Sequence, residues 1–121
     1  WIMVEQISRI TKKGGICIAT APFLIPYHAD PYDFFRYTKQ GLESLFIHEG
    51  FEVVESGTYG KAFGVLSEMI HFALLSPYET HGKTKWAKRT MRYVERLCHF
   101  LDRFVKTPVV YPNVYVVMRK K

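Results

Sequence analysis

Apolar positions along the 121 residues follow two spacings, one typical of helices and one typical of strands. Spacings of three and four, as on a helix with one buried face, occur in 1–11, 38–48 and 84–106. A further segment, 62–76, is apolar almost throughout and has the length of a helix. Short runs of small, β-branched and aromatic residues, which favour strands, occupy 16–21, 51–59 and 113–118. The pattern predicts the order helix, strand, helix, strand, helix, helix, strand.

Capping and turn residues agree with these borders. Thr38 is a favourable N-cap for the helix at 38–48, and Gly50 follows the end of that helix. The sequence Lys12-Lys13-Gly14-Gly15 places cations and glycine where the first helix must stop. The run at 16–21 lacks polar alternation, which predicts a strand covered on both faces, as in a parallel sheet. Strands that alternate with helices indicate an α/β fold.

The segment from Pro22 to Thr38 concentrates the polar chemistry of the chain. Its seventeen residues hold three prolines, one His, two Asp, one Arg and several aromatic residues. Proline removes an amide donor and clashes with the preceding turn, so the segment is not a regular helix. A loop that follows a strand is where α/β proteins usually carry their functional side chains. We therefore expect the candidate site here.

His28 is the candidate general base of this loop, since an imidazole with a pKa near 6.5 accepts protons at neutral pH. The alternative role is a hydrogen bond to a backbone carbonyl. Asp30 and Asp33 are expected to bind substrate hydroxyls or a substrate cation. Asp30, just before Pro31, also suits turn formation, and Asp33 and Arg36 are spaced to pair with each other.

The aromatic residues of the loop are interpreted either as the lining of a substrate pocket or as core residues. Tyr32 or Tyr37 is expected near a cleft that takes a ring-shaped substrate, whereas Phe34 or Phe35 is expected inside the core. The residues predicted to bind substrate are Asp30, Tyr32, Asp33, Arg36 and Tyr37. The other histidines share no metal-ligand spacing with each other or with cysteine, so we expect no metal site.

The net charge of +6 is concentrated near the C-terminus. Residues 83–106 hold eight Lys or Arg against two Asp or Glu. A cationic stripe of the helix at 84–106 includes Lys85, Lys88, Arg92, Arg96 and Arg103. This stripe is either a solvated helix face or a surface that recruits an anionic substrate or an anionic membrane. Nucleic acid ranks last, because no aromatic sheet motif accompanies the basic helix.

Composition places the protein in the cytoplasm, with peripheral membrane contact as an option through the cationic stripe. Cys17 and Cys98 have no metal or redox spacing, which fits a reducing compartment. No basic stretch followed by an apolar one marks a signal peptide. The longest apolar run, 62–76, is broken by Glu68 and His71 and is too short to cross a bilayer.

Several of these segments together resemble the C-terminal half of class I S-adenosylmethionine-dependent methyltransferases. Thr11-Lys-Lys-Gly-Gly15 looks like the family's Leu-Lys-Pro-Gly-Gly turn before strand five. Thr38 to Gly50-Phe51-Glu-Val is similar to the helix and Gly-Phe entry into strand six. The loop His28-x-Asp30-Pro31-Tyr-Asp33-Phe-Phe-Arg36-Tyr-Thr38 is similar to a subgroup that acts on small molecules or glycan precursors.

The resemblance implies a partial Rossmann-like methyltransferase fold with strands five to seven and flanking helices. The closing strand at 113–118 would be strand seven, antiparallel between strands five and six. Residues 1–121 would be the C-terminal half of one domain, with a helical insert at about 62–106. The implied function is S-adenosylmethionine-dependent methyl transfer to a small molecule or glycan precursor, with this half on the substrate side of the cleft.

The cofactor motif of that family is absent from the sequence. There is no Gly-x-Gly-x-Gly after a first strand and no acidic residue ending a second. We therefore expect a truncated chain that is inactive alone and prone to association, because the apolar faces of 16–21 and of the first helix lack partners. The alternative function is a non-catalytic interaction module that docks the basic helix at 84–106 on an anionic membrane or protein surface.

Overall fold

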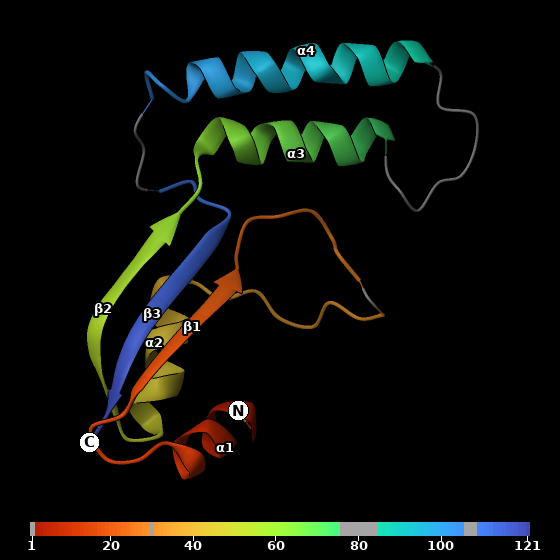
Figure 1. Cartoon of the computed structure of the whole chain (residues 1–121). Coiled ribbons are helices and arrows are strands. Elements are labelled where there is room, and N and C mark those ends of the chain that lie inside the picture. The colour runs from red at the N-terminus through yellow and green to blue at the C-terminus, as the bar shows by residue number, and fades with distance from the viewer. Residues whose placement is uncertain (1, 30, 76–84, 106–108) are drawn as a thin grey trace. The chain divides into compact units, whose positions relative to one another are not determined.

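The computed structural model describes residues 2–29, 31–75, 85–105 and 109–121 (Figure 1). These residues form a mixed α/β structure, as predicted. Its elements in chain order are α1 (Ile2–Ile10), β1 (Ile16–Pro22), α2 (Lys39–His48), β2 (Phe51–Tyr59), α3 (Ala62–Leu75), α4 (Lys85–Leu101) and β3 (Asn113–Lys120).

Most of the predicted borders are confirmed. The Thr38 hydroxyl accepts a hydrogen bond from the Gly41 amide at 3.1 Å and so caps α2. Gly14 and Gly50 adopt positive φ angles of 79° and 80° just beyond α1 and α2. The prediction of a helix reaching residue 106 is wrong for the described residues, because α4 ends at Leu101 and turns follow it.

The three strands form one sheet in the order β1-β3-β2, with β3 antiparallel to both neighbours. Val117 is paired with Ile18 on one side and with Glu55 on the other. The register of β2 shifts between Val53 and Glu55. The predicted place of the last strand, antiparallel between the other two, is therefore observed.

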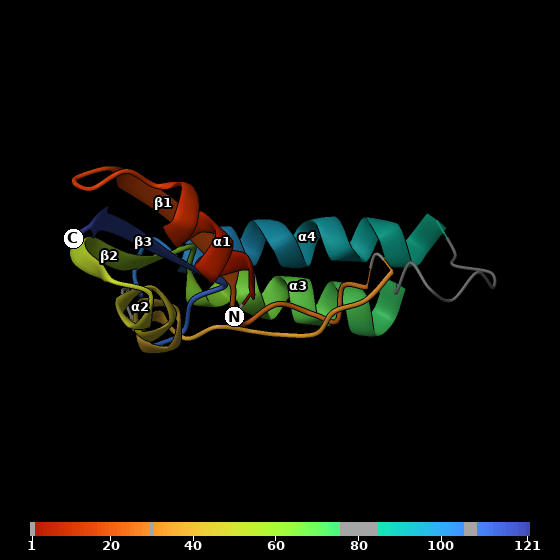
Figure 2. The same cartoon turned by 90° about the horizontal axis from the view of Figure 1, so that it is seen from below.

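A hydrophobic core lies between α2 and one face of this sheet (Figure 2). Phe46 and Phe51 meet edge to face with ring centroids 5.5 Å apart, and both are fully buried. On β3 the inward residues alternate, as the two-residue period of a strand requires. The buried β3 side chains are Val114, Val116 and Met118. Ser8 of α1 donates a hydrogen bond to the Glu49 carbonyl, which ties α1 to the end of α2.

The opposite face of the sheet is open. Ile16 and Ile18 of β1 are 52% and 70% exposed. The prediction that 16–21 is covered on both faces is therefore wrong for the described structure, in which a helix layer lies on the side of α2 and Ile16 and Ile18 stay exposed. The expected shortage of partners for α1 is also observed, because Ile2, Met3 and Ile10 are all more than half exposed.

The chain divides into two compact units. The first contains the sheet with α1 and α2, and the second comprises residues 24–34 and 60–112. In the second unit α3 and α4 lie side by side in both views and form a helical hairpin (Figures 1 and 2). This hairpin lies between β2 and β3 in the chain, where a helical insert is predicted. In the described part of the chain, none of the helices has both the length and the apolarity needed to cross a membrane.

Candidate functional site

The loop between β1 and α2 is closed at its base by backbone hydrogen bonding. The Tyr37 amide donates to the Pro22 carbonyl at 3.3 Å, and the Thr38 cap follows directly. The two ends of the loop therefore lie together at the carboxyl end of β1. The described residues between them, 23–29 and 31–36, form no helix or strand.

Within the loop, the side chain of Asp33 is hydrogen-bonded to the backbone of His28. The Oδ2 atom of Asp33 accepts a hydrogen bond from the His28 backbone amide at 2.9 Å. The two residues are thus brought together. The Asp33 carboxylate holds the backbone of the loop, and His28 is exposed. Arg36 is half-buried, and Asp30 lies outside the described residues.

The aromatic side chains of the loop are arranged differently from the prediction. Phe34 and Phe35 are 75% and 67% exposed, so the prediction that one of them lies in the core is wrong. The segment is irregular and proline-rich, so no helix or strand presents one of its sides to a core. Tyr32 is exposed and its ring centroid lies 5.3 Å from that of Phe34. Tyr37 is half-buried, with its ring centroid 6.2 Å from that of Phe35.

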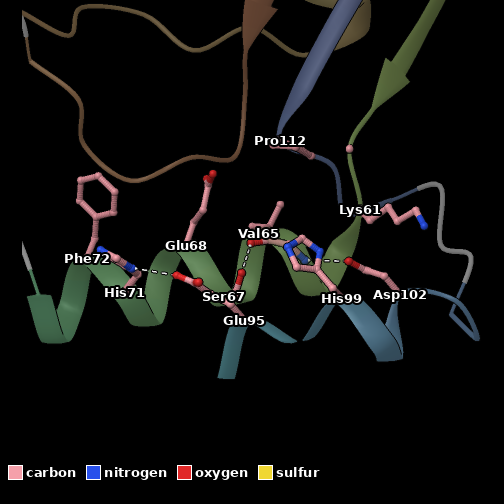
Figure 3. A pocket seen from close by; sticks show the side chains of 12 residues that line it. Lys61, Val65, Ser67, Glu68, His71, Phe72, Glu95, His99, Asp102 and Pro112 are labelled. Carbon is pink, nitrogen blue, oxygen red and sulfur yellow. Dashed lines mark hydrogen bonds and ion pairs between the residues drawn. The ribbon is translucent and has the colours of Figure 1, made fainter. Parts of the chain in front are cut away.

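The second unit also contains a cavity of about 540 Å³ that the sequence analysis does not identify (Figure 3). It lies along the α3–α4 hairpin. Its titratable lining residues are Lys61, Glu68, His71, Glu95, His99 and Asp102. Val65, Phe72 and Pro112 are among its apolar residues. Apolar walls with a few convergent polar groups are typical of small-molecule sites.

His71 of α3 and Glu95 of α4 form a pair in this cavity. Their Nδ1 and Oε1 atoms are 3.2 Å apart, and Figure 3 shows the two side chains pointing toward each other. A carboxylate at Nδ1 favours the tautomer with the proton there, which leaves Nε2 as a hydrogen-bond or proton acceptor. The side chains are 42% and 41% exposed, so the pair contributes little to stability by itself.

Asp102 has a structural role at the base of the cavity. It is only 4% exposed, and its two oxygens accept hydrogen bonds from the amides of Phe63 and Gly64 at 3.0 and 3.1 Å. Amides in the first turn of a helix have no partner within the helix. Asp102 therefore caps α3 from the end of α4, and its charge is favourable at that helix N-terminus.

Glu68 is the exposed acid of the cavity. Figure 3 shows Glu68 and Phe72 on the same flank of α3, as their spacing of four requires. Glu68 has no ion-pair partner among the described residues. A signal for this flank was present in the sequence, because Glu68 and His71 are the titratable residues that interrupt an otherwise apolar helix.

A smaller hollow of about 140 Å³ lies on α4. It is lined by four exposed residues, Arg89, Arg92, Tyr93 and Arg96. Arg92 and Arg96 belong to the predicted cationic stripe, and Arg103 is exposed beyond the end of the helix. The side chains of Lys85 and Lys88 lie outside the described part of the structure.

Neither a metal site nor a nucleotide cradle is found in the described residues. Within them, no three of the His, Cys, Asp and Glu side chains lie close enough to hold a metal ion. The glycines do not fit S-adenosylmethionine either: Gly14 and Gly50 end helices, and the loop after β1 contains none. At Gly60, which has a φ of 91°, the ring of Pro112 occupies the space beside the backbone. An added Cβ would lie 2.1 Å from that ring.

Comparison with known proteins gives no match for this chain among family models, curated proteins or solved structures.

Proposed function

We propose that the chain forms the substrate side of an S-adenosylmethionine-dependent methyltransferase that acts on a small molecule or a glycan precursor. The observation that carries the proposal is the strand order β1-β3-β2 with an antiparallel middle strand. This is the order that the resemblance implies for strands five, seven and six. The motifs quoted for the resemblance also lie where that assignment needs them, at the end of α1 and between α2 and β2.

The direction of the strands supports the proposed position of the site. β1 and β2 run the same way, and their last residues, Pro22 and Tyr59, both pair with Asn113 (Figure 1). In the chain, the His28 loop and the α3–α4 hairpin therefore each follow the carboxyl end of a strand. Ligands of α/β proteins bind beyond the carboxyl ends of the strands.

In the proposed reaction the chain binds and orients the methyl acceptor. His28 accepts the proton of an acceptor hydroxyl, and the carboxylate of Asp33 holds the backbone on which His28 sits. Tyr32, Arg36 and Tyr37 supply contacts to a ring-shaped or anionic acceptor. The hairpin cavity has a volume in the range of small-molecule pockets, and the carboxylate of Glu68 suits a hydroxyl group.

The cofactor is assigned to other residues. The described part of the chain does not fit S-adenosylmethionine, so the proposal places its binding site on a segment outside these 121 residues. That segment would supply the electrophilic methyl group. The present residues would position the acceptor and take up its proton.

The test uses the protein made from the complete reading frame that includes these codons. It is incubated with tritiated S-adenosylmethionine and fractionated metabolite and glycan extracts, and the label that reaches small molecules is counted. His28→Ala is expected to lower this transfer about 100-fold, the size of a general-base contribution. Its thermal midpoint should stay close to that of the parent, because His28 is exposed.

His48→Ala is the matched control, since His48 is an exposed histidine at the end of α2. It should leave label transfer unchanged. Undiminished transfer in both His28→Ala and Asp33→Asn would contradict the site, and no transfer by the parent to any extract would contradict the function.

A further inference from the structure

Independently of that function, we propose that the α3–α4 hairpin docks on an anionic lipid bilayer. Arg89, Arg92 and Arg96 would bind lipid phosphates while the neighbouring apolar side chains enter the interface. The proposal rests on three features of the hairpin: a row of arginines, the lack of acids beside it, and an exposed apolar side.

The arginines form one row on α4. Arg92 and Arg96 follow Arg89 by three and seven residues, and these spacings bring side chains to the same helix face. All three are exposed, and with Tyr93 they surround the hollow on α4. Within the described residues none of the three has an ion-pair partner. Guanidinium groups stay charged at all relevant pH values and match phosphate geometry. Adjacent like charges favour an anionic ligand between them.

The acids of α4 and the turn after it do not offset these charges. Glu95 is paired with His71 of α3, and Asp102 caps the first turn of α3. Both carboxylates are thus engaged with α3. The described outward surface of α4 is therefore cationic without compensating acids, which gives it charge complementarity to an anionic surface.

Beside the arginines runs a row of apolar and aromatic side chains. Tyr93, Leu97 and Phe100 are spaced four and three residues apart on α4, and Phe104 lies in the turn after the helix. Such spacing normally marks the buried face of a helix. Here the four side chains are 56%, 58%, 51% and 71% exposed. Phe100 and Phe104 pack edge to face, with centroids 5.1 Å apart, and form a compact apolar end to the row.

The second helix also has exposed apolar side chains. Leu66 and Leu74 of α3 are 47% and 62% exposed. At about 100° per residue both are turned away from Glu68, which lines the cavity. On α4 the same argument turns Leu97 away from His99, another cavity residue. On each helix, exposed apolar side chains thus lie on a different flank from these cavity residues.

A bilayer interface accounts for both features together. Amphipathic helices that lie in the interface place cations at the headgroups and large apolar side chains in the acyl boundary. A nucleic acid or an acidic protein would use the arginines but would leave Leu66 and Leu74 without a role. Docking would be parallel to the membrane, since no described helix is suited to crossing it.

The test is flotation of the 121-residue chain with vesicles of roughly three parts phosphatidylcholine to one part phosphatidylglycerol. Flotation separates bound protein from aggregates, which sink. The chain is expected to float with these vesicles and to remain at the bottom with pure phosphatidylcholine. Arg89→Glu, Arg92→Glu and Arg96→Glu together should lower the bound fraction at least tenfold.

The matched control makes the same charge change in the other unit. It consists of Arg9→Glu, Lys12→Glu and Lys13→Glu, three exposed cations of the α1 region. Far-UV circular dichroism checks that both triple variants are folded. An equal loss of binding in the two variants would overturn the proposal, because it would show that net charge alone is responsible.

Insertion is tested with Phe104→Trp in a Trp1→Phe and Trp86→Phe background, so that the new tryptophan is the only one, and with vesicles that carry brominated acyl chains. Quenching of the new tryptophan is expected if the apolar side enters the interface, and Leu97→Ser with Leu74→Ser should reduce it. Unquenched fluorescence in floated protein would overturn the insertion. Absence of flotation, with or without binding to RNA or heparin, would overturn the membrane proposal as a whole.

Discussion

Tyr115 couples two strands through its phenol. Its hydroxyl donates a hydrogen bond of 2.7 Å to Oε1 of Glu55 across the β2–β3 pair. The ring lies over Gly57, where an added Cβ would meet the ring at 2.6 Å, so glycine leaves room for it. The hydrogen bond to Glu55 raises the pKa of Tyr115, with smaller contributions from desolvation and from the charge of Glu55.

The raised pKa predicts how stability depends on alkaline pH. The neutral phenol is favoured in the folded state, so its contribution is complete below the unfolded tyrosine pKa of about 10 and is lost as pH rises through the higher folded value. Tyr115→Phe should lower the thermal midpoint at pH 7 and reduce the loss of stability above about pH 10. Thermal melts of both proteins between neutral and alkaline pH measure this.

Tyr59→Phe is the control, because Tyr59 is exposed on β2 and its hydroxyl has no hydrogen-bond partner among the described residues. Its alkaline profile should follow that of the parent. Parallel profiles for the parent and Tyr115→Phe would contradict the assigned role of the phenol.

At the same scale, residue types were easier to predict than residue partners. The sequence identifies Asp33 as a turn former or an ion-pair partner, and the structure shows a bond to the His28 amide. Which amide a carboxylate reaches depends on the dihedral angles of an irregular loop, and these have no periodic signal. The burial of Phe34 or Phe35 was wrongly predicted for the same reason, since a loop has no face that alternation defines.

At the scale of the element, α3 depends on a cap from another helix. Asp102→Ala would leave the amides of Phe63 and Gly64 without acceptors in a nearly buried place. We expect the free energy of unfolding to fall by about 1–2 kcal/mol, the usual cost of losing an N-cap. Chemical denaturation measures the loss, and hydrogen exchange should show faster exchange at these two amides.

Glu95→Gln tests whether this effect is specific to the cap. The His71–Glu95 pair is partly exposed, so its loss should cost less than the loss of the cap. Equal destabilisation by the two substitutions, or unchanged exchange at Phe63 and Gly64 in Asp102→Ala, would show that the cap does not hold α3.

The element borders were predictable because they depend on local signals. Thr38 and Gly50 delimit α2 through capping and a positive φ, and both effects act within one turn. The end of α4 at Leu101 was not predicted. The next residue, Asp102, accepts hydrogen bonds from α3, and this long-range contact has no signal in the local sequence. The cavity was missed too, since the meeting of His71 with Glu95 depends on how two helices align, which neither helix encodes alone.

At the scale of the whole molecule, the strand order was predictable from the family resemblance but not from periodicity. Periodicity identifies β3 as a strand and its alternate residues as buried, and it does not say which strands flank β3. The open side of the sheet follows from the same arrangement. β1 stands at the edge, and in the described part of the chain no layer covers its outward isoleucines.

This edge predicts that the 121-residue chain associates with itself. β1 offers an unpaired row of backbone groups, and Ile16 and Ile18 beside it are 52% and 70% exposed. Edge pairing and apolar contact both favour association of such a surface. Ile16→Lys with Ile18→Lys should therefore shift the chain toward monomer in size-exclusion chromatography with light scattering.

Thr20→Lys is the control, because it adds a charge to the same exposed strand without removing apolar surface. If the double-lysine variant associates as strongly as the parent, the surface responsible for association lies elsewhere. A parent that is monomeric at all concentrations would contradict the prediction. If the double variant is monomeric and Thr20→Lys is not, the apolar side chains of β1 drive association, rather than its backbone edge or its lack of charge.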